Sequence, residues 1–202
     1  MQLVGMLDSP YVRRVAVSLR LLDLPFEHLP LSVFGTFEAF GRINPVVKAP
    51  TLVADDGSVL MNSSLILQWV ATLSQRSLRP LGGPALQRDL RITGLALAAC
   101  EKAVQLVYER NLRPAERQHA PWTERVSGQL RAACALLEAE LGQAPLPAPA
   151  QEITDAGVTT AVAWGFMQMM VADTVHAADH PLLAAYAQQA ERLPAFAACP
   201  AR

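Results

Sequence analysis

The first third of the chain alternates between two spacings of apolar residues. One segment places them every three or four residues, the spacing of one helix face, at Val12, Val15, Ala16, Leu19 and Leu22. Pro25 ends this predicted helix. Shorter apolar runs indicate strands at residues 2–7, 25–33, 51–54 and 58–61. One or two helical turns at 36–42 and a helix at 63–73 complete the order β-α-β-α-β-β-α.

Local turn signals refine this pattern. Pro30 restricts the second strand to an edge of the sheet, because proline cannot donate to a central ladder. Asp55-Asp56-Gly57 lies between two apolar runs and predicts a hairpin that joins the last two strands.

The composition changes near residue 75. The segment QRSLRPLGGP (75–84) carries two prolines and two glycines and is typical of a linker. Beyond it the spacing is helical, at about 84–111, 121–141, 154–171 and 179–192. The third of these helices is apolar on nearly every side, as in the centre of a bundle. We therefore expect an α/β domain at 1–75, a linker at 76–84 and an all-helical domain at 85–202.

Charge and composition exclude several classes of function. The 202 residues are 51% hydrophobic with a net charge of −1, which disfavours binding to nucleic acid or to an anionic membrane. No apolar run approaches the roughly 20 residues that span a bilayer, and no secretory signal is visible. The three cysteines form no metal-binding spacing, and we expect reduced thiols in a cytoplasmic protein: Cys100, Cys134 and Cys199.

Ser9-Pro10 stands directly before the first predicted helix. Serine is a favoured N-cap and proline a favoured first helical residue, so helix initiation alone explains this pair. A second role is compatible with the first. The helix begins after the first strand of an open α/β sheet, at the edge where ligands gather. A hydroxyl there can donate to a bound thiolate, and the helix N-terminus also lowers the pKa of a thiol.

Two further segments follow the same logic. Pro50 in NPVVKAPTL directly precedes a predicted strand. A cis Ala49-Pro50 bond there would leave the Ala49 backbone free to pair with an extended peptide. A trans proline at the start of a strand is the simpler alternative. In MNSSLILQWV we expect Ser63 or Ser64 to cap the next helix, whose N-terminus can hold a carboxylate.

These segments resemble the glutathione transferase superfamily over nearly the whole chain. SPYVRRVAVSLRLLDLPFEHLPL is similar to the first helix and second strand of serine-type soluble members, and NPVVKAPTLVADDGSVLMNSSLILQWV to their cis-proline loop, hairpin and third helix. EITDAGVTTAVAW and ERLPAFAACPA resemble the start of the family's central helix and its usual C-terminal ending. The resemblance implies a thioredoxin-like N-terminal domain, an all-α helical-bundle C-terminal domain and a homodimer.

The resemblance also assigns candidate residues. It implies a glutathione S-transferase with glutathione as co-substrate and no metal, in which Ser9 is the catalytic group that holds the thiolate. Residues matching the glutathione-binding positions are Ser9, Lys48, Ala49, Pro50, Asn62 and Ser63. A small hydrophobic electrophile would bind an apolar cleft between the domains, with Tyr11, Phe34 and Tyr108 as candidates, although core packing explains these aromatic residues equally well.

Two positions depart from the family pattern, and the absence of cysteine from one domain also bears on the chemistry. Asn62 stands where Glu, Gln or Asp is usual, so the bond to the γ-glutamyl amine would lack a charge. Glu152 replaces the usual Ser or Thr three residues before Asp155, so Thr154 is the alternative cap. No cysteine lies in the N-terminal domain, which disfavours mixed-disulfide chemistry.

Two other functions remain open at this stage. A glutathione-dependent isomerase of small unsaturated dicarboxylic acids has the same fold, although the SSC-type start of that branch is absent here. A non-catalytic interaction protein with this fold is the other alternative. His176 and His180 are four residues apart, but the intervening sequence indicates a helix end, so we expect no metal site.

Overall fold

The chain divides into two units by its internal contacts. The computed structural model describes residues 1–148, 150 and 152–201. One unit comprises Met1–Leu78 together with the segment that begins at Pro194, and the other comprises Arg79–Leu193. The change in composition predicts that the segment from Pro194 belongs to the helical domain, whereas its contacts group it with the first unit.

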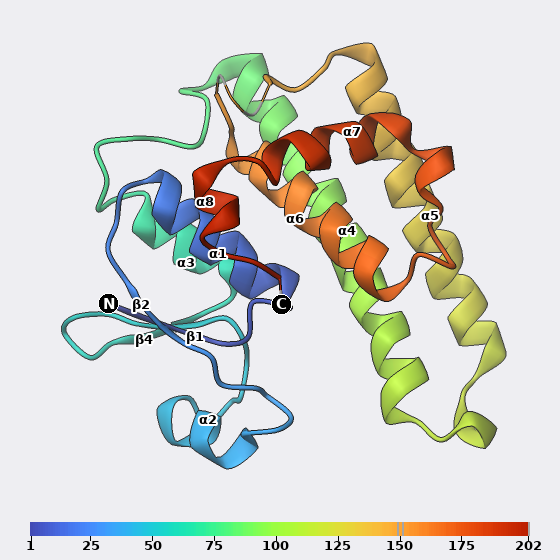
Figure 1. The fold of residues 1–202 in the computed structure, drawn as a ribbon, viewed down its shortest axis with the longest axis horizontal. Coiled ribbons are helices and arrows are strands. Elements are labelled where there is room, and N and C mark those ends of the chain that lie inside the picture. Colours follow the sequence, from blue (N-terminus) through green and yellow to red (C-terminus); the bar gives the residue numbers. More distant parts are fainter. Residues whose placement is uncertain (149, 151, 202) are drawn as a thin grey trace. The chain divides into compact units, whose positions relative to one another are not determined.

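The first unit contains a four-stranded sheet in the order β2-β1-β3-β4 (Figure 1). β1 runs parallel to β2, and β3 is antiparallel to both β1 and β4. The strands are β1 (Gln2–Val4), β2 (Glu27–Leu29), β3 (Thr51–Val53) and β4 (Val59–Met61). As Pro30 predicts, β2 is an edge strand. Central β1 and β3 supply the fully buried side chains Leu3, Val4 and Leu52.

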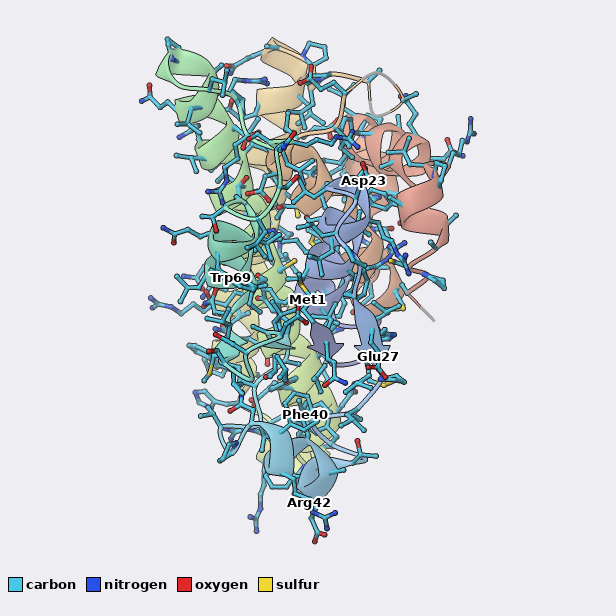
Figure 2. The ribbon with its side chains drawn as sticks, turned by 90° about the vertical axis from the view of Figure 1, so that its left-hand side faces the viewer. Met1, Asp23, Glu27, Phe40, Arg42 and Trp69 are labelled. Carbon is cyan, nitrogen blue, oxygen red and sulfur yellow. The ribbon has the colours of Figure 1, made fainter. Side chains whose placement is uncertain are left out.

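Three helices belong to this sheet, α1 (Pro10–Leu21), α2 (Phe37–Ile43) and α3 (Ser63–Val70). Helices α1 and α3 contact each other on one side of the sheet, and α2 lies on the other (Figure 1). On α2, Phe40 is fully buried while Arg42 is exposed (Figure 2). The predicted order β-α-β-α-β-β-α is confirmed, with strands shorter than expected.

A short C-terminal helix, α8 (Pro194–Ala197), packs against α1. The buried Arg13 side chain joins them, because its Nε donates to the Cys199 carbonyl at 2.8 Å and its guanidinium lies 5.6 Å from the centre of the Phe196 ring. Both contacts stabilise the segment, the second through a cation–π interaction. No periodic pattern predicted this four-residue helix.

The second unit is all-helical. Its elements are α4 (Gly83–Leu112), η1 (Ala115–Arg117), α5 (Ala120–Gln143), α6 (Asp155–Met170), η2 (Ala177–Asp179) and α7 (Pro181–Ala190). α6 packs against α4 and α7, and 12 of its 16 residues are buried, so the expected central helix is confirmed. Within the described part of the chain, no helix combines the length and apolarity needed to cross a membrane.

The start of α6 is held by two oxygen acceptors. Thr154 caps the helix as expected, because its Oγ1 accepts from Gly157 N at 3.3 Å. Asp89, which belongs to α4, accepts from Ala156 N at 3.4 Å through Oδ1. This carboxylate therefore serves the helix N-terminus at which the usual capping-box serine or threonine is replaced by Glu152. Burial raises the pKa of Asp89, and the neighbouring Asp155 carboxylate adds to this effect.

Replacing Asp89 with Asn should change how stability depends on pH. The pKa of Asp89 is raised above its ordinary value of 3.8, so the folded protein holds this proton more tightly than the unfolded chain does. The stabilisation from Asp89 is therefore complete below about pH 4 and is lost as pH rises through the raised pKa. In urea unfolding at several pH values, the wild type should lose free energy of unfolding relative to Asp89→Asn as pH increases.

Asp173→Asn provides a matched control. The hydrogen bond from Arg110 lowers the pKa of Asp173, so this carboxyl is ionised in both the folded and the unfolded chain above about pH 5. The difference in free energy of unfolding between Asp173→Asn and the wild type should therefore stay constant from about pH 5 to neutral pH. A constant difference for Asp89→Asn over the same range would contradict the prediction.

Candidate functional site

The candidate segments meet at one end of the sheet because of strand register. Val4 pairs with Thr51, and Thr51 pairs with Met61, so these residues form a row across three adjacent strands. The chain leaves β1 and β4 at this row and enters β3 there. Two candidate segments directly adjoin the row, because Ala49-Pro50 precedes β3 and Asn62-Ser63 follows β4. Ser9 follows β1 after the turn at residues 5–8.

Ser9 caps α1 and is half-buried. Its Oγ accepts from Val12 N at 3.5 Å, and Pro10 is the first helical residue, as the sequence predicts. The cap uses a lone pair of the hydroxyl and leaves the O–H as a donor. Capping and donation to a bound anion are therefore compatible roles of one side chain.

The turn that leads from β1 to Ser9 depends on Gly5. Its φ is +139°, a backbone conformation that residues with a side chain rarely adopt. An added Cβ would also lie 2.6 Å from Val12 Cγ2 and 3.3 Å from Ala49 Cβ. The backbone is bonded on both sides, since Gly5 N donates to Leu29 O at 3.0 Å and the His28 ring nitrogen lies 2.8 Å from Gly5 O. This close approach sets the spacing between α1 and the segment before Pro50.

The Ala49-Pro50 peptide bond is cis, so the simpler trans alternative is wrong. Two buried polar residues hold the loop around it. Thr51 Oγ1 donates to Lys48 O at 2.8 Å and accepts from Asn44 Nδ2 at 2.8 Å. Ala49 is half-buried, and Lys48 is exposed. The Lys48 ammonium is therefore accessible, while its carbonyl is fixed within the loop.

Asn62, and not Ser63 or Ser64, caps α3. Asn62 Oδ1 accepts from Ser64 N at 2.9 Å, and its φ of +74° is one that Asn tolerates better than most residues. The serine hydroxyls are engaged elsewhere, because Arg14 Nη1 donates to Ser63 Oγ at 3.2 Å and to Ser64 Oγ at 3.0 Å. The sequence-based expectation of a serine cap is wrong for this reason.

The aromatic candidates have different settings. Tyr11 is half-buried in the first turn of α1, and Phe34 is 57% exposed in the loop before α2. Tyr108 belongs to α4 in the second unit and is 44% exposed, and partial burial raises the pKa of its hydroxyl.

In the second unit, Arg110 donates to Asp173 Oδ1 at 2.9 Å, so this arginine is paired within its own helical bundle.

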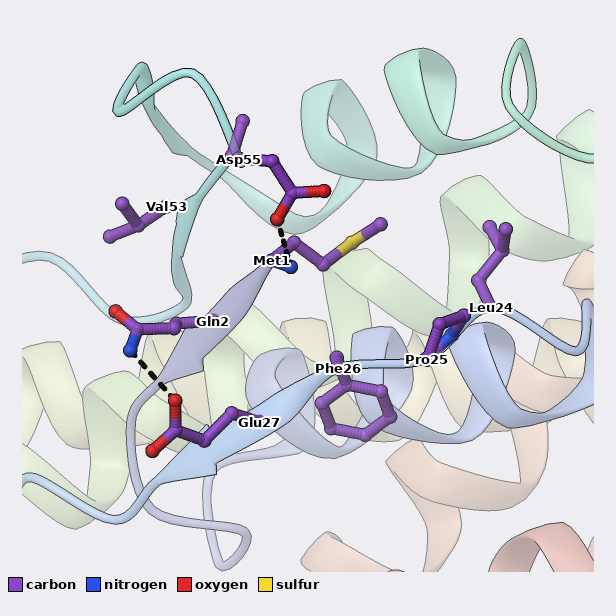
Figure 3. A pocket seen from close by; sticks show the side chains of 9 residues that line it. Met1, Gln2, Leu24, Pro25, Phe26, Glu27, Val53 and Asp55 are labelled. Atoms are coloured by element: carbon purple, nitrogen blue, oxygen red, sulfur yellow. Dashed lines mark hydrogen bonds and ion pairs between the residues drawn. The ribbon is translucent and has the colours of Figure 1, made fainter.

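A surface hollow lies at the opposite end of the sheet (Figure 3). Residues from the start of β1 and β2 and the end of β3 line it, including Gln2, Glu27 and Val53. Gln2 Nε2 donates to Glu27 at 2.7 Å across it. This hollow contains none of the candidate residues.

The row at the strand ends gathers the features of an anion- and peptide-binding edge. It combines two helix N-termini, a hydroxyl donor at each, and the cis-proline loop that leads into β3, which lies between β1 and β4. Sequence reasoning missed the residues that hold this edge in shape: Gly5, Arg14, Asn44 and Thr51. Of these, Asn44 had a visible signal, because Asn-Pro favours a turn. Among the described residues, no cluster of His, Cys, Asp and Glu could hold a metal ion.

Known proteins share both the sequence of the first unit and the fold of the whole chain. A model of the glutathione S-transferase N-terminal domain family matches residues 3–77. A glutathione S-transferase of Methylobacterium radiotolerans, solved in complex with glutathione sulfonate, is 25% identical, with a TM-score of 0.89 over 98% of this chain and 93% of its own. The first unit thus matches the glutathione S-transferase family in sequence, and the whole chain shares the fold of glutathione transferases. The expected fold class, a thioredoxin-like domain with an all-helical one, is thereby confirmed.

Other glutathione transferases are also similar to this chain. A glutathione transferase family member of Pseudomonas fluorescens, solved with bound glutathione, is 29% identical with a TM-score of 0.84, over 98% of this chain and 97% of its own. Glutathione S-transferase U4 of Arabidopsis thaliana is 30% identical over 69 residues. The chain spans about a third of the length of the curated relatives it matches, 31% and 37%.

Gly5→Ala should destabilise the protein strongly. The substitution adds backbone strain at φ +139° and a clash with Val12, so we expect a loss of about 3 kcal/mol or more. Gly82→Ala is the matched control, because Gly82 has φ +145° with nothing within 4 Å of an added Cβ. It should cost only about 1 kcal/mol. Equal losses in urea unfolding would show that the close approach at Gly5 does not matter.

Proposed function

We propose that the protein is a glutathione transferase that binds glutathione as a thiolate and directs it at a small hydrophobic electrophile. The observation that carries this proposal is the strand register that brings Ser9, Ala49-Pro50 and Asn62-Ser63 to one edge of the sheet. Structural neighbours solved with glutathione or glutathione sulfonate support it.

Each part of glutathione has a matching group in this proposal. The Ala49 backbone, before the cis bond, pairs with the cysteinyl residue, and the accessible Lys48 ammonium reaches the glycyl carboxylate. Ser63 receives the γ-glutamyl carboxylate at the N-terminus of α3, where N–H groups and the helix dipole favour an anion. Asn62 Oδ1 already accepts from Ser64 N, so only its remaining lone pair is available for the γ-glutamyl amine.

The chemistry requires only that the thiol be ionised. The Ser9 hydroxyl donates to the thiolate sulfur, and the N-terminus of α1 adds a partial positive charge. Lowering the thiol pKa by about two units needs about 2.7 kcal/mol, which a charge-assisted hydrogen bond and a helix terminus together can supply. The thiolate then attacks the electrophilic carbon and forms a carbon–sulfur bond. In a substitution, the bond to the leaving group breaks and that group departs with the electron pair. In an addition, the π bond breaks and the resulting carbanion takes up a proton from water. Ser9 itself forms no covalent bond.

Substrate assays separate this activity from its relatives. Conjugation of a chlorinated aromatic compound supports transferase activity, whereas turnover of maleylacetoacetate or maleylpyruvate alone would indicate an isomerase. Retention on glutathione resin would argue against a non-catalytic interaction protein. We also infer a cytoplasmic protein from the three buried free thiols. The resemblance suggests a homodimer, which light scattering in solution tests.

Ser9→Ala should raise the pKa of bound glutathione. Without the hydroxyl donor, the thiol pKa should return by about one to two units toward its free value near 8.5, and kcat/KM at neutral pH should fall by about tenfold or more. The pKa is measured from thiolate absorbance during a pH titration of the complex. Ser9→Thr retains both the cap and the hydroxyl and should keep the low pKa. An unchanged pKa in Ser9→Ala would remove Ser9 from the mechanism.

A further inference from the structure

The parallel ladder between β1 and β2 ends at Gly5. Gly5 N donates to Leu29 O at 3.0 Å, and a continued parallel ladder would have Gly5 O accept from Leu31 N. Leu31 N is used elsewhere, because it donates back to Leu29 O at 2.8 Å. The chain thus turns away after β2, and Gly5 O loses the backbone donor that a longer ladder would supply.

A side chain takes the place of this donor. His28 belongs to β2, where it pairs with Leu3, and its Nε2 lies 2.8 Å from Gly5 O. A carbonyl oxygen can only accept, so Nε2 carries the hydrogen and donates it. Gly5 is buried, and a buried carbonyl without a partner would cost free energy. His28 therefore satisfies the carbonyl at which the turn after β1 begins.

The turn at residues 5–8 transmits this restraint to Ser9. The Gly5 carbonyl and Met6 N belong to one planar peptide unit, so the bond from His28 fixes the orientation of that unit. Met6 O in turn accepts from Ser9 N at 3.2 Å, which closes the turn. Glycine allows a wide range of backbone angles, so a restraint on its carbonyl matters more here than at a residue with a side chain.

The Ser9 side chain is only loosely held by its own helix. Its Oγ accepts from Val12 N at 3.5 Å, which is longer than the usual range of about 2.7–3.2 Å. The side chain is also half-buried, so packing does not enclose it on every side. The path of the backbone from β1 therefore contributes to fixing where the Ser9 oxygen lies.

We propose that His28 is a positioning residue that places the Ser9 hydroxyl for its hydrogen bond to the ligand's thiolate. This inference rests on the proposed function, in which Ser9 holds that thiolate. His28 does not touch the ligand and acts through Gly5 O and the turn. A purely structural role would weaken every ligand at this edge of the sheet. A positioning role changes the ionisation of the thiol, because the sulfur is the part of the ligand that depends on Ser9.

Two ligands separate these roles. Glutathione has an ionisable thiol, whereas S-methylglutathione has the same peptide with a sulfur that cannot ionise. His28→Phe keeps a ring and removes the donor, so the pKa of bound glutathione should rise by about half a unit to one unit. Thiolate absorbance during a pH titration of the complex measures this shift. The calorimetric affinity for S-methylglutathione should change by less than about twofold.

Conservative variants serve as rescue and control. His28→Gln should retain the wild-type thiol pKa, because the amide nitrogen of Gln reaches about as far as Nε2 and can donate. Glu27→Ala removes the bond from Gln2 at the other end of β2 and should also leave the thiol pKa unchanged. If His28→Phe does not fold, His28→Asn replaces it, because its shorter amide does not reach Gly5 O. A rise in Glu27→Ala as large as in His28→Phe would contradict the inference.

A double variant tests whether His28 acts through Ser9. In a Ser9→Ala background, His28→Phe should cause no further rise in the thiol pKa, and a further rise would contradict the inference. Equal weakening of both ligands with an unchanged thiol pKa would overturn the positioning role and leave the proposed function intact. A wild type that binds glutathione with the pKa of the free thiol would overturn the proposed function and this inference together.

Discussion

The alignment of three strand ends is the constraint on which the candidate site depends. The strands are only three residues long, so a shift by one residue would reverse every side chain and move each adjoining segment along the edge. Leu3 and Val4 face opposite sides of the sheet and both are fully buried, so a shift would force each side chain into a space shaped for a different one. Core packing thus fixes the relative positions of segments that lie far apart in the sequence.

The hydroxyl groups at this edge of the sheet can each accept one hydrogen bond and donate another. The Ser9 hydroxyl accepts from the helix and retains a proton to donate, and Thr51 Oγ1 both donates and accepts within the cis-proline loop. Hydroxyls suit such positions because one atom can satisfy a buried backbone group and still carry a directed donor. The site therefore needs few side chains, each with a fixed orientation.

Local signals predicted the elements, and long-range contacts decided what remained. Ser9-Pro10, the Asp-Gly hairpin and the central helix were visible because capping, turn chemistry and apolar spacing act over a few residues. The cap of α3 was misassigned because Arg14, 49 residues before Ser63, engages the serine hydroxyls. The place of α8 was missed because it depends on a contact between residues 186 positions apart. No periodic pattern encodes either interaction.

The attachment of α8 to α1 has a consequence for the order in which the chain acquires its structure. During synthesis, the sheet and α1 leave the ribosome first, yet the residues that cover part of α1 come more than a hundred positions later, after the whole helical unit. N-terminal domains often complete their folding early. Here the buried Arg13 would wait for its carbonyl partner until Cys199 emerges, so the first unit is completed only after the helical unit has been synthesised.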